Sequence, residues 1–151
     1  MDYKQIWGKT LNTSEQVKYE FSVGDRYRMT GLVVWVLIGA LLMFSSVQYG
    51  MIVILFSVFY FGFYIRAANV YAFTNQRVLV HRGWLSTKLI STDYQKITDV
   101  TVHEPFLSRV FFHVGSLEID TAGTNRKDIV LKNIEHPYEV KKKLDELRGQ
   151  Q

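Results

Sequence analysis

Histidine and carboxylate side chains have the clearest capacity for chemistry in this sequence. His103 and His113 stand ten residues apart on segments that we predict to be neighbours, and Glu104 lies beside the first of them. Three such ligands could hold a zinc ion. The sequence has no HExxH motif or other closely spaced ligand pair, so ordinary surface or edge-strand histidines are the favoured interpretation.

Nucleophilic chemistry has less support. The sequence contains no cysteine, so it offers no thiol nucleophile, no disulfide and no zinc site of the cysteine type. Serine, histidine and aspartate are present, but no GxSxG nucleophile elbow or comparable frame brings them together. We therefore predict no catalytic residue, no metal ligand and no cofactor, and we do not expect an enzyme.

Two segments could bind anions. Residues 121–127 could cradle an anion through backbone amides beside Arg126 and Lys127, although a hairpin turn is the more usual role of this composition. At a predicted turn, an exposed Trp84 could enter the lipid headgroup layer while neighbouring cations meet phosphates; packing of Trp84 onto the domain is the alternative. The lipid-surface candidates are Arg28, Arg66, Arg82, Trp84 and Lys88.

An apolar cluster follows Pro105 at helix-turn spacing around Arg109. We expect this cluster to form a lid over the open end of a sheet. If it is exposed instead, it offers a contact surface for a protein partner or for the predicted membrane helices described below, because exposed apolar patches mark interaction sites. The cluster includes Phe112, and its partner-contact candidates are Phe106, Leu107, Val110 and Phe111.

The elements that must position these residues begin with a long apolar block. Residues 29–65 contain no Asp, Glu, Lys, Arg or His over 37 positions, whereas one crossing of a bilayer takes about 20 apolar residues. The central segment Ser45–Gly50 has polar side chains and a glycine that favour a turn. We therefore predict a helical hairpin, Met29–Phe44 and Met51–Ile65, that crosses the membrane twice.

Small residues and charges around this block predict its packing and orientation. Gly31 and Gly39 fall on one helical face, where the second helix could approach closely. Arg26 and Arg28 precede the block, Arg66 follows it, and the turn carries no charge. Because positive charge favours the cytoplasmic side, we expect a multi-pass membrane protein with both termini in the cytoplasm.

The rest of the sequence divides into two modestly basic pieces. The whole chain of 151 residues has a net charge of +4, and no basic stripe interleaved with aromatic residues indicates nucleic-acid binding. Val17–Phe21 alternates like a strand, and Trp7, with Tyr3 and Ile6, could lie on the bilayer; a partly ordered tail is the alternative. The expected organisation is an N-terminal cytoplasmic segment (1–28), a transmembrane hairpin (29–66) and a cytoplasmic domain (67–151).

Beyond residue 66, short alternating runs separated by turn residues predict antiparallel strands. Pro137 and the spacing of Val140, Leu144 and Leu147 predict a C-terminal amphipathic helix. The fold class is then a membrane α+β protein, with a two-helix transmembrane hairpin and an antiparallel β-barrel or sandwich capped by a C-terminal helix. The predicted strands cover residues 70–73, 77–81, 85–94, 97–104, 115–121 and 128–134.

This order of strands and helix resembles a pleckstrin-homology (PH) fold, and the sequence resembles the bacterial PH-domain membrane proteins of the YdbS-like kind. The likeness implies a membrane-tethered module of the bacterial cytoplasmic membrane without a catalytic signature. Eukaryotic relatives bind phosphoinositides through several basic residues at the first hairpin loop, whereas Thr74–Arg77 has only one, so no phosphoinositide-specific site is expected. The likeness is carried by residues 71–86, 93–100, 106–111 and 115–123 and by the helix after Pro137.

We therefore expect a membrane-tethered PH-like binding or scaffold module that assembles with other membrane proteins or with itself. One alternative is a sensor of anionic lipid surfaces, which would use the basic turn around Trp84. A more remote alternative is an enzyme or transporter accessory subunit.

Overall fold

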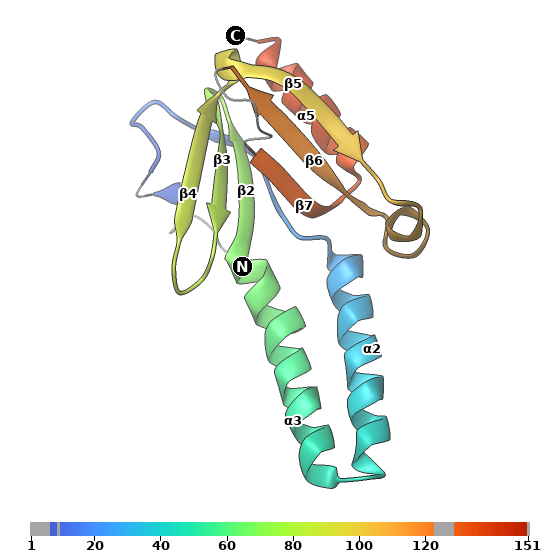
Figure 1. Ribbon diagram of the computed structural model, residues 1–151. Helices are drawn as coiled ribbons and strands as arrows, with labels where there is room; N and C mark the ends of the chain where they lie inside the picture. Colours follow the sequence, from blue (N-terminus) through green and yellow to red (C-terminus); the bar gives the residue numbers. More distant parts are fainter. Residues whose placement is uncertain (1–6, 9, 123–128, 151) are drawn as a thin grey trace.

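The computed structural model describes residues 7–8, 10–122 and 129–150, and it shows a head of two β-sheets standing on a pair of helices (Figure 1). The first helix of the pair is α2 (Asp25–Met43). The second begins as α3 (Val47–Ser57) and continues through the π-helix η1 (Val58–Tyr64) into α4 (Ile65–Ala68). The two helices of the predicted hairpin are therefore present. α2 begins four residues before its predicted start and ends one residue before its predicted end, whereas the second helix extends beyond both of its predicted bounds.

The turn between the two helices is shorter than predicted. Ser46 is extended, with φ −156° and ψ 116°, and α3 begins at the next residue. Val47–Gly50, which we expected in the turn, therefore forms the first turn of α3. Ser46 has the extended conformation that is usual for a helix N-cap, although its side chain makes no capping hydrogen bond.

Glycines allow the two helices to approach closely. A Cβ atom on Gly39 would lie 2.6 Å from Cγ1 of Ile54 and 3.1 Å from the carbonyl oxygen of Gly50. A Cβ atom on Gly31 would collide with the ring of Phe61. The predicted glycine face is confirmed, and Gly50 contributes to it from the second helix.

The strands form two antiparallel sheets that face each other. The first sheet has the order β1 (Val17–Ser22), β2 (Asn69–Thr74), β3 (Arg77–Arg82), β4 (Lys88–Asp93). The second has the order β5 (Ile97–His103), β6 (Val114–Thr121), β7 (Ile129–Glu135). A short 3₁₀ turn, η2 (Tyr94–Lys96), links the sheets, and the π-helix η3 (Ser108–Phe112) stands between β5 and β6.

The expected strands beyond residue 66 are all present, with one displaced start. β4 begins at Lys88 rather than at Leu85, because Gly83 adopts a φ of +91° and opens a loop through Thr87. Within the described residues no ladder joins β4 to β5 or β1 to β7. The sandwich that we expected is thus correct, and the closed barrel is wrong.

The core lies between the sheets and beneath α5 (Pro137–Arg148), the predicted C-terminal helix. In Figure 1, α5 lies alongside β5 and β6 of the second sheet. Alternate side chains of the strands point inward and meet the apolar face of α5. The core includes Tyr71, Phe73, Val78 and Val80 from the first sheet, Leu117, Ile119, Ile129 and Leu131 from the second, and Val140, Leu144 and Leu147 from α5.

The helix pair is inserted between two neighbouring strands of the first sheet. β1 precedes the helices, β2 follows them, and the two strands pair with Phe21 opposite Tyr71 and Ser22 opposite Val70. Only Val23 and Gly24 separate β1 from α2, and β2 follows α4 directly. The sheet therefore takes one strand from residues 1–28, which the sequence-based division placed outside the domain.

The segment before β1 covers the outer face of the first sheet. Trp7 is 2% exposed and packs against Val70, Ala72 and Leu79. Its indole N–H donates a hydrogen bond of 2.6 Å to Oε1 of Glu20. The prediction that Trp7 lies on the bilayer is wrong, because the sheet offers the apolar surface that the ring covers; Tyr3 and Ile6 lie outside the described residues.

A buried carboxylate fastens the same segment to the β2–β3 turn. Glu15 accepts hydrogen bonds from Nε and Nη2 of Arg77 at 2.8 and 2.7 Å, from Oγ1 of Thr74 at 2.8 Å and from the backbone N–H of Asn12 at 3.1 Å. Burial alone would raise the pKa of Glu15, but these hydrogen bonds and the charge of Arg77 hold it below its ordinary value. Glu15 is therefore ionised in the folded protein at neutral pH.

Candidate functional site

The β3–β4 loop carries two lipid-surface candidates to the end of the second helix. The Trp84 ring meets the rings of Phe59 and Phe63 edge-on, with centroids 6.1 and 5.5 Å apart. Trp84 remains 44% exposed and the next residue, Leu85, is 89% exposed. Lys88, where β4 begins, is exposed as well. Trp84 thus packs against the helix pair rather than the sandwich, and part of its ring remains exposed on the surface of the protein.

Two of the arginine candidates are engaged within the protein. Nε of Arg28 donates to the carbonyl of Phe61 at 3.1 Å, and the same side chain pairs with Asp25. Arg82 donates to the carbonyl of Val130 and so joins β3 to β7 in the other sheet. These guanidinium groups fasten the helices to each other and the two sheets to each other.

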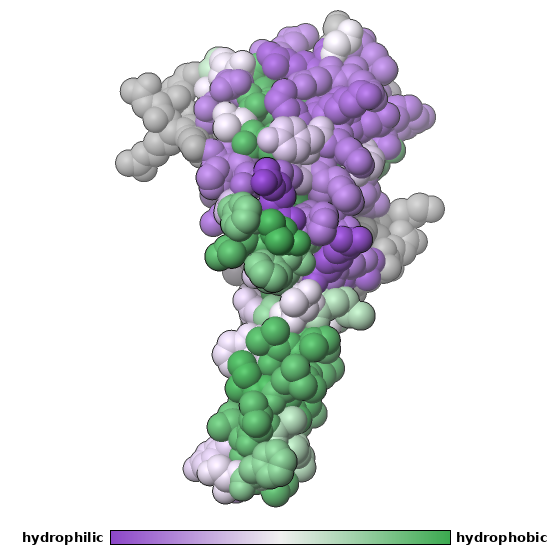
Figure 2. Space-filling view, turned by 90° about the vertical axis from the view of Figure 1, so that its right-hand side faces the viewer, coloured by the Kyte–Doolittle hydropathy of each residue, from purple (hydrophilic) through white to green (hydrophobic). Residues whose placement is uncertain are grey.

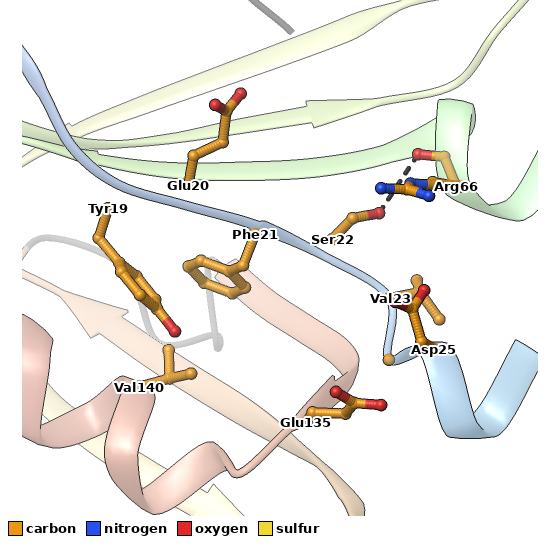
Figure 3. Close-up of a pocket in the computed structure, with 10 residues that line it drawn as sticks. Tyr19, Glu20, Phe21, Ser22, Val23, Asp25, Arg66, Glu135 and Val140 are labelled. Carbon is orange, nitrogen blue, oxygen red and sulfur yellow. Dashed lines mark hydrogen bonds between the residues drawn. The ribbon is translucent and has the colours of Figure 1, made fainter. Parts of the chain in front are cut away.

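Arg66, the remaining candidate, lines a cavity of about 220 Å³ where the helices leave the head. Figure 3 shows this cavity between β1, the start of α2 and the end of β7, with Tyr19 and Phe21 directed toward Val140 of α5. Oγ of Ser22 lies 3.2 Å from the carbonyl oxygen of Arg66. Small-molecule pockets usually exceed about 300 Å³, so this cavity is the size for a side chain rather than a large ligand.

The cavity is bordered by charged groups and by an edge strand. Asp25, Glu135 and Arg66 all line it (Figure 3). The backbone N–H of Arg26 donates to Oε1 of Glu135 at 2.9 Å, and that of Gly24 donates to the carbonyl of Asn133 at 2.8 Å. These bonds fix the start of α2 to the second sheet. The sequence analysis missed this site, although the alternation of residues 17–21 was its available signal.

The apolar cluster after Pro105 does not cover the core. Its four partner-contact candidates are between 48% and 68% exposed, whereas α5 and the two sheets enclose the core without them. The lid interpretation is therefore wrong. The cluster instead lies beside the helix pair, where the ring of Phe112 meets that of Tyr27 in α2 with centroids 5.8 Å apart. The exposed residues are Phe106, Leu107, Val110 and Phe111.

The candidate zinc ligands are separated by their elements. His103 ends β5 and Glu104 follows it, while His113 follows η3 and its Nδ1 lies 3.1 Å from Nη1 of Arg26. Across the described part of the chain, no three histidine or carboxylate side chains are grouped closely enough to hold a metal ion. Most of the possible anion loop, residues 123–127, lies outside the described residues.

The sequence profile of the family described as Bacterial PH domain matches residues 21–150, which include the helix pair as well as both sheets. The chain belongs to the bacterial PH domain family. Domains of this fold are generally binding or scaffolding modules rather than enzymes. The finer likeness to the YdbS-like members remains a resemblance.

Two crystal structures have the same fold as this bacterial PH domain. One is a DUF1696 family protein with a pleckstrin-homology domain from Shewanella loihica PV-4, at 15% identity and a TM-score of 0.54, covering 97% of this chain and 93% of that one. The other is a pleckstrin homology domain from Shewanella amazonensis SB2B, at 12% identity and a TM-score of 0.53, covering 96% and 84%. No curated protein matches the chain.

Proposed function

We propose that this bacterial PH domain protein is a membrane-tethered binding or scaffold module. Its two helices cross the bilayer, and its head assembles with other membrane proteins at the cytoplasmic surface. The observation that carries the proposal is the insertion of the helix pair between the adjacent strands β1 and β2, which makes the membrane anchor part of the binding fold.

The surface of the helix pair supports the tether. Both helices are long and apolar enough to cross a membrane by length and composition, and few of their side chains are buried in the protein. In Figure 2 the helix pair is a continuous hydrophobic shaft below a mostly hydrophilic head. Apolar surface of this extent is unfavourable in water and favourable in a bilayer. Exposed side chains of the shaft include Leu37, Leu41, Ile52 and Leu55.

The short connections support a tether of fixed orientation. Two residues join β1 to α2, none separates α4 from β2, and hydrogen bonds tie Gly24 and Arg26 to β7. A flexible linker would let the head sample all orientations, whereas this junction always presents the same face to neighbouring proteins. Confinement to a surface also raises the effective concentration of partners, so weak contacts suffice for assembly.

The cavity beside β1 is the candidate site for such a partner. Among the described residues no strand pairs with the outer edge of β1, so its backbone groups can accept an extended segment of another membrane protein. Asp25, Glu135 and Arg66 border the cavity and favour a partner that brings a polar or charged side chain to it.

The tether is tested with single cysteines, since the sequence has none of its own. In sealed vesicles, Ser45→Cys in the helix turn and Lys142→Cys on α5 are labelled with a membrane-impermeant maleimide before and after lysis. We expect that, before lysis, one of the two sites is labelled and the other is protected, and that the protein resists carbonate extraction. If both sites are labelled before lysis, if both are labelled only after lysis, or if carbonate releases the protein, the tether is contradicted.

Assembly is tested by photo-crosslinking in native membranes. A photoreactive residue at Asp25, which lines the cavity, is compared with one at Glu146, which is exposed on α5 away from it. We expect the same membrane protein, or a second copy of this chain, to be captured repeatedly from position 25 and not from position 146. Equal products from the two positions would contradict a partner site at the cavity.

A second candidate function, sensing of anionic lipid, is favoured by the position of the β3–β4 loop. Trp84 contacts the end of the second helix, and Leu85 and Lys88 are exposed beside it. A fluorophore at Leu85→Cys in the full chain, reconstituted into vesicles, is expected to shift when anionic lipid replaces zwitterionic lipid, and high salt should reverse the shift. An identical spectrum in both lipids rejects sensing and leaves the scaffold function.

A further inference from the structure

We propose that residues 106–111, which lead into η3 and form most of it, make a second, in-plane membrane contact that inserts into the headgroup region beside α2. The proposal rests on the membrane tether proposed above. It assigns the exposed apolar cluster to lipid rather than to a protein partner, and it gives the head a contact with the bilayer that does not depend on crossing it.

The position of η3 along α2 sets its depth. The ring of Phe112 meets the ring of Tyr27, and the charge-free stretch of α2 begins only two residues later, at Met29. At roughly 1.5 Å per helical residue, these two positions differ by about 3 Å along the helix axis. Phe112, which ends η3, is therefore held within one helical turn of the level at which the apolar shaft begins, and residues 106–111 directly precede it.

The exposed surface of this segment has the chemistry of an interfacial anchor. Phe106, Leu107 and Phe111 are each at least 64% exposed, although large apolar side chains in a soluble protein would normally be covered. Arg109 is exposed among them, and residues 105–113 contain no acidic side chain. Apolar side chains with a basic neighbour are typical of segments that lie in the plane of the interface, because the cation can reach lipid phosphates.

The surroundings favour lipid over protein. Figure 1 places η3 at the side of the head beside the start of α2, and Figure 2 views the molecule from that side, where a hydrophobic patch lies on the head next to the hydrophobic shaft. A bilayer around the shaft extends sideways and reaches this patch without any further partner. The β3–β4 loop lies beside the end of the second helix, where the ring of Trp84 meets that of Phe63 and Leu85 is exposed. This loop is thus close to the head end of the second helix, as η3 is close to the head end of α2.

The experiment uses the full chain with one cysteine at a time, labelled with an environment-sensitive NBD fluorophore and reconstituted into vesicles of neutral lipid alone. Leu107→Cys and Phe111→Cys report on the cluster. Lys142→Cys on α5 is the exposed control on the head, and Leu37→Cys, in the middle of α2, is the control for the tether. Each sample is measured in ordinary lipid, in lipid brominated near the top of the acyl chains, which reports on positions 107 and 111, and in lipid brominated near the chain ends, which reports on position 37.

We expect blue-shifted emission that brominated lipid quenches at positions 107 and 111, and unquenched emission at position 142. Quenching at position 37 with none at 107 or 111 overturns the lipid contact while the tether stands, and the cluster is then a surface for a protein partner. Absence of quenching at position 37 overturns the tether and the inference with it. An unlabelled double variant, Phe106→Ser with Phe111→Ser, is the folding control. It changes only exposed side chains, so it should unfold like the unsubstituted protein and show that the head folds without these two rings.

Discussion

Replacing Glu15 by alanine is expected to release the N-terminal segment from the first sheet. The carboxylate is buried and accepts four hydrogen bonds, two of them from Arg77. Removing one partner of a buried ion pair costs about 3–5 kcal/mol because the other charge is left unpaired. The side chain of Arg77 is 19% exposed and regains some water, so we expect a loss near the lower limit, about 3 kcal/mol. Glu15→Gln keeps the shape and one acceptor oxygen, but it removes the counter-charge of Arg77 and turns an amide NH2 toward hydrogen-bond donors, so we expect a similar loss, about 3 kcal/mol.

The assay is denaturant or thermal unfolding in detergent micelles over a range of pH. The folded-state pKa of Glu15 is below its unfolded value, so its contribution to stability is present above the unfolded pKa, ordinarily about 4.5, and is lost as the pH falls through the lowered folded pKa. Glu15→Gln should lack this part of the acid dependence. Glu146→Ala, an exposed acid in a surface ion pair, is the matched control and should change stability by no more than about 0.5 kcal/mol. If Glu15→Ala unfolds like this control, the buried ion pair does not fasten the segment.

Three further substitutions test the packing of the shaft and of the head by unfolding measurements. Gly39→Leu should destabilise the helix pair by about 1–3 kcal/mol, because a Cβ atom there would lie 2.6 Å from Ile54. Gly62→Leu is the control and should have little effect, because nothing outside its own helix backbone lies within 4 Å of its Cβ. Equal effects of the two substitutions would refute the close approach at Gly39. Gly83→Ala should cost about 1–3 kcal/mol because φ is +91° there, and a neutral result would mean that the loop readily adopts another conformation. Leu144→Ala should cost about 2–5 kcal/mol from its fully buried site beneath the sheets, a value near zero being incompatible with the described core.

Local patterns predicted the elements of this protein well. Alternation identified the strands from Val70 onward, and the spacing of Val140, Leu144 and Leu147 identified α5, because burial of one face leaves a periodic signature in the sequence. The charge-free block identified the helix pair because composition, like periodicity, is a local property of the sequence. The boundaries shifted by a few residues where a turn or cap, such as that at Ser46, decided the geometry.

Long-range pairing was not predictable in this way. The alternation of residues 17–21 indicated a strand, but nothing local in it shows that Phe21 lies opposite Tyr71. An indole ring such as that of Trp7 can be buried either in a bilayer or against a sheet. Here the hydrogen bond to Glu20 and the apolar outer face of β2 and β3 hold it against the sheet. Helix-turn spacing likewise described the local form of residues 106–111 without showing what they face.

The insertion of the shaft between β1 and β2 also constrains the order of folding. Ser22 and Asn69 are 47 positions apart in sequence, yet Oγ of Ser22 donates to the carbonyl of Asn69 at 2.5 Å. Closing so long a loop is entropically unfavourable until α2 and the second helix have come together and brought their ends into proximity. Pairing of α2 with the second helix is thus expected to precede completion of the first sheet, and a nascent chain in which the two helices fail to pair is left with an unpaired β1 and an incomplete head.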